Sequence, residues 1–107
     1  MLIRPFKYQI AIGDWMMYNQ GLYDWIIDTH PWLSNSMRDD YKLKTSLKYK
    51  MYDIGIFKRS GLVEVQLQDQ RYIGTDKIFT HILNPDGTCI DQGFEGFSDQ
   101  FLVKVTR

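Results

Sequence analysis

The chain has 107 residues, of which 44% are apolar, and its thirteen basic side chains balance thirteen acidic ones. This length allows one domain with a modest core, and sixteen aromatic residues exclude a disordered chain. The zero net charge argues against a wholly basic nucleic-acid binder and against an acidic mimic of DNA. We therefore expect one folded domain over residues 1–107.

The single cysteine, Cys89, excludes an internal disulfide and favours a reducing compartment, the cytoplasm. The longest apolar runs, such as residues 25–27, are far shorter than the roughly 18 to 20 residues that cross a bilayer. No apolar stretch near the N-terminus precedes a cleavage site, so we expect no secretion signal. The sequence thus predicts a cytoplasmic protein that does not enter a membrane.

The composition favours sheet over helix. Alanine occurs once and glutamate twice, whereas aspartate occurs eleven times, so two strong helix formers are scarce. Tyrosine, isoleucine and phenylalanine are plentiful and suit a half-buried pleated surface. The same bias is typical of AT-rich genomes, including those of many phages.

In chain order, residues 6–11 alternate apolar and polar side chains and predict a strand that ends at Gly13 and Asp14. Residues 13–31 have two interpretations. We favour a helix capped by Asp14 and ended by Pro31, with apolar side chains at spacings of three and four. Gly21 would cost this helix about 1 kcal/mol relative to alanine, so residues 19–21 could instead form a hairpin turn.

Residues 41–52, YKLKTSLKYKMY, alternate strictly and predict a strand. A helix is the competitor, because Leu43, Leu47 and Met51 also fit a helical stripe. Only a strand places four lysines on one face, and we call these the lysine strip: Lys42, Lys44, Lys48 and Lys50. The apolar phase changes near Met51 and Tyr52, which indicates a bulge.

The remaining chain predicts an antiparallel meander with strands at residues 63–68, 77–83 and 101–106. Turn residues at 59–61 precede the first of these strands, and turn residues at 84–87 follow the second. The expected fold is α+β: one small domain, mainly an antiparallel sheet of five or six strands, with one or two short helices in the N-terminal third. An all-β fold is the alternative.

No motif for a metal, a phosphate loop or a cofactor occurs in the sequence, so we expect no cofactor. A nucleophilic Cys89 would need a base such as His81. If residues 84–87 form a four-residue hairpin loop, Ile82 pairs with Cys89. The side chains of His81 and Cys89 then point to opposite faces of the sheet. The sequence thus favours a structural role for both residues.

The lysine strip suggests one function. Lysines at alternate strand positions lie about 6.6 to 7 Å apart, close to the phosphate spacing along one nucleic-acid strand, and Tyr49 with Tyr52 could stack on bases. The competing interpretation is a solvated sheet face, in which lysines protect an edge strand from aggregation.

The aromatic residues of the N-terminal third suggest another function. Five of them exceed what a core of this size needs, and such residues are enriched where proteins meet: Trp15, Tyr18, Tyr23, Trp25 and Trp32. Our leading hypothesis is a small non-enzymatic binding module that contacts a protein partner or a second copy of itself, as a phage accessory or inhibitor protein would. Nucleic-acid binding is the alternative, and a small metal- or acid/base-dependent hydrolase using Asp28, His30 and His81 is the third hypothesis.

Overall fold

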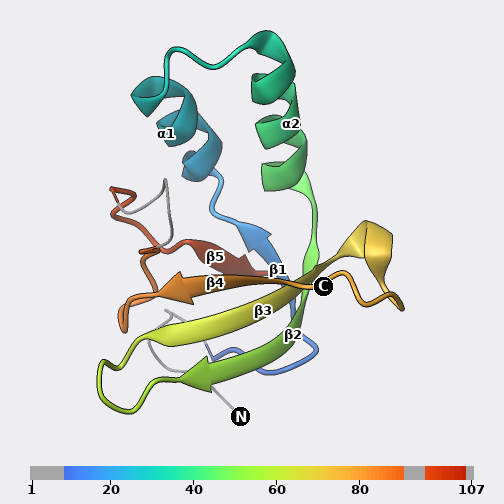
Figure 1. Ribbon diagram of the computed structural model, residues 1–107, viewed down its shortest axis with the longest axis vertical. Helices are drawn as coiled ribbons and strands as arrows, with labels where there is room; N and C mark the ends of the chain where they lie inside the picture. The colour runs from blue at the N-terminus through green and yellow to red at the C-terminus, as the bar shows by residue number, and fades with distance from the viewer. Residues whose placement is uncertain (1–8, 91–95, 106–107) are drawn as a thin grey trace.

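The computed structural model describes residues 9–90 and 96–105. Within them, five strands form one antiparallel sheet in the order β4-β3-β2-β1-β5, and two helices join β1 to β2 (Figure 1). The elements are β1 (Trp15–Tyr18), α1 (Gly21–Thr29), α2 (Asn35–Ser46), β2 (Tyr49–Ile56), β3 (Val63–Asp69), the 3-10 helix η1 (Gln70–Tyr72), β4 (Phe79–Leu83) and β5 (Leu102–Lys104). The predicted α+β fold with a mainly antiparallel sheet is confirmed.

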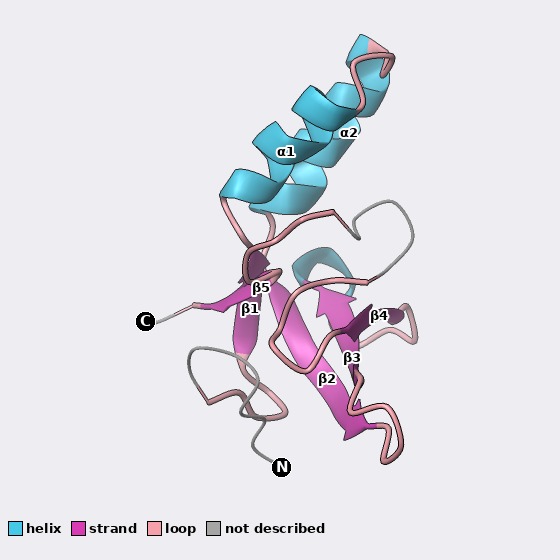
Figure 2. Cartoon of the chain, turned by 90° about the vertical axis from the view of Figure 1, so that its left-hand side faces the viewer, coloured by secondary structure: helices cyan, strands magenta, loops and turns pink. Residues whose placement is uncertain are grey.

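The helices α1 and α2 form a hairpin, the helical arm (residues 21–46), which stands on one end of the sheet (Figures 1 and 2). Its base is fixed because β1 and β2 are neighbouring strands, with Met16 opposite Tyr49. The chain therefore leaves the sheet at the end of β1 and returns beside that point at the start of β2. Two helices replace a tight turn in this connection.

Neither interpretation of residues 13–31 is correct as a whole, because a strand precedes a helix. Trp15–Tyr18 pairs with both β2 and β5, and the helix begins only at Gly21. Asn19 forms the junction: its side chain accepts a hydrogen bond from the Gly21 amide at 2.9 Å and donates one to the Gln100 carbonyl at 2.8 Å. The expected helix end before Pro31 is confirmed, since α1 ends at Thr29.

The predicted strand over residues 41–52 is wrong in its first half, where α2 runs to Ser46. The side chain of Ser34 caps this helix by accepting a hydrogen bond from the Met37 amide at 3.3 Å. The apolar stripe of Leu43, Leu47 and Met51 does not account for this helix. Leu43 is 45% exposed, and α2 ends before Leu47. A cap and local helix propensity therefore outweighed the alternation of side chains.

The three strands predicted after residue 60 are present, with a correction to the last of them. Residues 1–8 are not described, so the strand expected at 6–11 lies largely outside the described residues. The bulge in β2 is confirmed by a register shift between Met51 and Asp53. In β5 the buried side chain is Leu102, whereas Val103 is 38% exposed, because Leu102 pairs with Tyr18 on the inner face. Phe101, which is also buried, directly precedes the strand.

The core lies between the inner face of the sheet, the helical arm and the segments that precede β1 and β5. The inner face of the sheet carries alternate residues of each strand, including Met16, Met51 and Leu67. The outer face carries mostly polar side chains, such as Lys50, Gln66 and Thr80. The helical arm adds Leu22 and Ile26 to the core from α1, while no residue of α2 is fully buried.

Gly87 is expected to be a sensitive position of the turn after β4. Its φ of +88° disfavours any side chain, and a Cβ there would approach the amide group of Gln100 within 2.9 Å. Replacing Gly87 by alanine should lower the free energy of unfolding by about 2 to 3 kcal/mol, measured by urea denaturation.

Gly74→Ala is the matched control, because Gly74 has a φ of +86° and nothing within 4 Å of the added Cβ. It should cost only about 1 to 2 kcal/mol, the conformational part of the effect. Equal losses for the two variants would show that contact with Gln100 carries no penalty.

Candidate functional site

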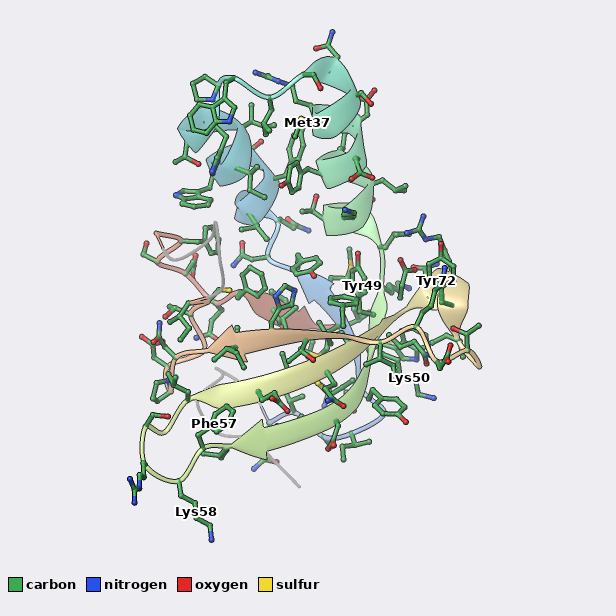
Figure 3. All side chains as sticks on the ribbon, in the orientation of Figure 1. Met37, Tyr49, Lys50, Phe57, Lys58 and Tyr72 are labelled. Atoms are coloured by element: carbon green, nitrogen blue, oxygen red, sulfur yellow. The ribbon has the colours of Figure 1, made fainter. Side chains whose placement is uncertain are left out.

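A cavity of about 560 Å³ lies between the helical arm and the inner face of the sheet. Its apolar wall includes Leu22 and Ile26 of α1 and Ile78 from the loop before β4. Rings form much of the remaining wall: Tyr18, Tyr41, Tyr49, Tyr72, Phe79, His81 and Phe101. In Figure 3, Tyr49 lies at the foot of α2, and Tyr72 lies beyond it on η1.

Tyr18 is the centre of the cavity floor. Its hydroxyl shares a hydrogen bond of 2.7 Å with Nε2 of His81. Its ring packs edge-to-face against three neighbours, with centroid distances of 5.1 Å to Tyr49, 5.2 Å to Phe101 and 5.7 Å to His81. Such pairs each add a fraction of a kcal/mol to about 1.5 kcal/mol beyond burial, so the floor is a preorganised aromatic cluster.

Tyr49 joins the floor to the arm. Its hydroxyl donates a 2.5 Å hydrogen bond to the carbonyl oxygen of Lys44 in α2, and only 2% of the residue is exposed. Burial raises the pKa of Tyr49 from 10.0 to about 12, and the nearby Asp69 carboxylate adds to the increase. Tyr49 is therefore an uncharged hydrogen-bond donor at neutral pH.

The rim of the cavity carries three cations. Arg71 forms a forked ion pair with Asp69, with Nη2 to Oδ2 at 2.7 Å and Nε to Oδ1 at 3.2 Å. Hydrogen bonds from the Arg71 side chain lower the pKa of Asp69 against the opposing effect of burial. The side chains of Arg71 and Lys44 remain 43% and 54% exposed, and Lys77 is also exposed.

Each rim cation lies against a tyrosine ring. Lys77 Nζ is 4.4 Å from the ring centroid of Tyr72, and the Arg71 guanidinium carbon is 5.4 Å from the same centroid. Lys44 Nζ lies 6.0 Å from the ring of Tyr41. The rim thus combines positive charge with aromatic surface. Two of its cations also have carboxylate partners, because Arg71 pairs with Asp69 and Lys44 pairs with Asp40 at 3.0 Å.

The five aromatic residues expected to contact a protein do not form one surface. Of these, Tyr18 lines the cavity, while Trp15 lies on the opposite face of the sheet. Trp25 packs against the core beside Phe97, and Tyr23 is half-buried on α1. Trp32 is 72% exposed in the loop that joins α1 to α2.

The lysine strip does not exist as a single face, because its members belong to different elements. Lys42 and Lys44 lie on α2, Lys48 precedes β2, and Lys50 lies on the outer face of β2 (Figure 3). Of the residues predicted to bind nucleic acid, Lys44 and Tyr49 line the cavity. Tyr52 is 52% exposed at the bulge of β2.

The expected pairing after β4 is wrong. Leu83 pairs with Cys89, and the Asn84 amide donates to the Thr88 carbonyl at 2.7 Å, so the loop has three residues instead of four. His81 and Cys89 therefore share a face, with His81 on the cavity wall and Cys89 buried in the core.

The three residues of the hydrolase hypothesis are separated. Asp28 and His30 lie at the C-terminal end of α1, whereas His81 lines the cavity from β4. His30 contacts the Ile26 carbonyl and packs against the rings of Trp25 and Trp32. Among residues 9–90 and 96–105, no group of three His, Cys, Asp or Glu side chains could hold a metal ion.

Sequence reasoning missed the residues that distinguish the cavity: Arg71, Tyr72, Lys77, Phe79 and Phe101. A partial signal exists in DQRYIGTDK, where cations at positions 71 and 77 flank a tyrosine. Comparison of the chain with protein-family models, curated proteins and solved structures gave no match. In the described part of the chain, no helix has the length and apolar character needed to cross a membrane.

Tyr49 should make stability fall at alkaline pH. Because folding raises its pKa, the neutral phenol stabilises the fold below pH 10, and this contribution is lost as pH rises toward about 12. The free energy of unfolding of the wild type should fall by about 1 to 2 kcal/mol more than that of Tyr49→Phe over this range. Chemical denaturation at several pH values measures the difference.

Tyr52→Phe is the control, because Tyr52 is exposed and its loss should leave the pH profile of the wild type unchanged. At pH 7, Tyr49→Phe should cost about 1 kcal/mol through the lost hydrogen bond to the Lys44 carbonyl. Parallel profiles for the wild type and Tyr49→Phe would contradict the assigned shift.

Proposed function

We propose that the protein is a small non-enzymatic binding module and that its cavity receives a ring-bearing group of the partner. The carrying observation is the cavity itself: about 560 Å³, lined largely by aromatic and aliphatic side chains, with charged groups at its rim. Ligand pockets of proteins typically have volumes of about 300 to 1,000 Å³ and this combination of apolar walls and a few polar groups.

The hydrogen bonds of the polar groups on the cavity floor favour a binding role over a catalytic one. The hydroxyl of Tyr49 is occupied by the Lys44 carbonyl, and burial keeps this phenol neutral. The hydroxyl of Tyr18 is paired with His81. Both contacts fix ring positions, and fixed rings reduce the entropy lost when a planar group enters.

Contact with a protein through the remaining aromatic residues is a further part of this proposal. Trp32 supports it best, since its large side chain is 72% exposed in the loop of the helical arm. An exposed tryptophan is unusual enough to suggest a contact, because this residue type is highly buried on average and enriched at binding hot spots. The cavity carries the stronger argument, because many convergent side chains build it.

Filling the cavity should abolish binding. In a fragment screen followed by amide chemical shifts, planar ring compounds should shift the amides of Tyr18, Phe79 and His81. The double variant Thr45→Trp/Ile78→Trp places two indoles on the cavity wall and should reduce these shifts at least tenfold.

The control is Ser46→Trp/Ile73→Trp, which adds the same side chains at exposed positions of α2 and the same loop. This variant should bind fragments as the wild type does. The proposal is wrong if no fragment shifts the cavity amides, if the two double variants behave alike, or if a bound compound is chemically converted.

A further inference from the structure

We propose that the group received by the cavity is a nucleotide: a planar base joined to a phosphate, either free or at the end of a single strand. This inference rests on the proposed function and adds the chemical class of the ligand. Its basis is the division of the cavity into an aromatic floor and a cationic rim, which matches a molecule with one planar end and one anionic end.

The floor fits the base. Tyr18, Phe79, His81 and Phe101 pack edge-to-face, with centroid distances between 4.9 and 5.7 Å. Aromatic side chains bind bases of any sequence by stacking, because every base has a π face. Tyr41 and Tyr72 extend the aromatic wall from the floor toward the rim.

The rim fits the phosphate. Its cations come from three separate segments: Lys44 from α2, Arg71 from η1 and Lys77 from the loop before β4. The Arg71 guanidinium has five N–H donors and donates to Asp69 from Nε and Nη2. The donors on Nη1 are not part of this ion pair. The Arg71 side chain is 43% exposed and accessible to a ligand.

The number of rim cations favours a phosphate over a carboxylate. Three cations line the cavity, while Asp69 pairs with Arg71 and Asp40 pairs with Lys44 at 3.0 Å, so one net positive charge remains. A phosphate monoester has three acceptor oxygens, whereas a carboxylate has two. A group with three oxygens therefore suits donors that come from three separate segments.

Isothermal titration calorimetry with AMP tests the match at about 50 mM salt, with adenosine and inorganic phosphate as the two halves of the ligand. AMP should bind at least tenfold more tightly than either half, because the floor and the rim then act together. Raising the salt to about 200 mM should weaken AMP binding and leave adenosine binding nearly unchanged.

Lysine variants test whether the phosphate is bound by the lysines that line the cavity or by another lysine of α2. Lys44→Ala and Lys77→Ala should each weaken AMP binding about two- to fivefold, the upper part of the usual range for an exposed charge pair. Lys42→Ala is the matched control, because Lys42 lies on α2 two residues before Lys44 and does not line the cavity. It should bind AMP as the wild type does, and circular dichroism should show all three variants folded.

A 5′-phosphorylated tetra-adenylate distinguishes the two sources of the ligand. Tighter binding of AMP assigns the site to a free nucleotide, and tighter binding of the oligonucleotide assigns it to a strand end; both results support the proposal.

Four results would overturn the proposal. These are equal affinity for AMP and adenosine, equal affinity for AMP and phosphate, a loss with Lys42→Ala as large as with Lys44→Ala, or no AMP binding. If AMP fails while ring fragments still shift the cavity amides, the nucleotide inference falls and the binding module stands. If both fail, the cavity is not a binding site.

Discussion

The pairing of β1 with β2 is the constraint on which the cavity depends. Met16 faces Tyr49 across these neighbouring strands, so the two helices between them must leave and re-enter the sheet at almost the same place. Asn19 fixes the exit by bonding to Gly21 and Gln100, and the Tyr49 hydroxyl fixes the return by bonding to Lys44. The arm consequently stands on the sheet end (Figure 2). The cavity lies between the base of the arm and the inner face of the sheet.

The same constraint explains why aromatic side chains gather there. At the junction of arm and sheet, Tyr18, Tyr49 and Phe101 meet from three separate segments of the chain. Edge-to-face packing holds these rings in place and leaves about 560 Å³ unfilled. The unfilled space lacks the packing contacts that side chains would make there. A ligand that fills it would therefore also stabilise the fold.

Sequence patterns predicted the sheet better than the site. Alternation identified β3, the phase change identified the bulge of β2, and turn residues marked the ends of strands, because these signals are local. The alternation in residues 41–46 failed because the Ser34 cap and an Asp40–Lys44 pair on the helix stabilise α2, which buries none of its residues. The cavity was unpredictable since its walls come from segments as distant as Tyr18 and Phe101, which only the strand order brings together.

The rim shows how a short segment can be prepared for an anion. Asp69 accepts hydrogen bonds from the Arg71 amide and side chain, so the carboxylate both caps η1 and aligns the guanidinium. Gln70 joins the same turn to Lys48 through two hydrogen bonds, and the Tyr72 ring lies near both the Arg71 and the Lys77 cations. Because these contacts already order the cations, a ligand would lose less entropy in binding them than in gathering free lysines. The Asp69 carboxylate therefore lowers the positive charge of the rim by one unit and fixes the orientation of the Arg71 side chain.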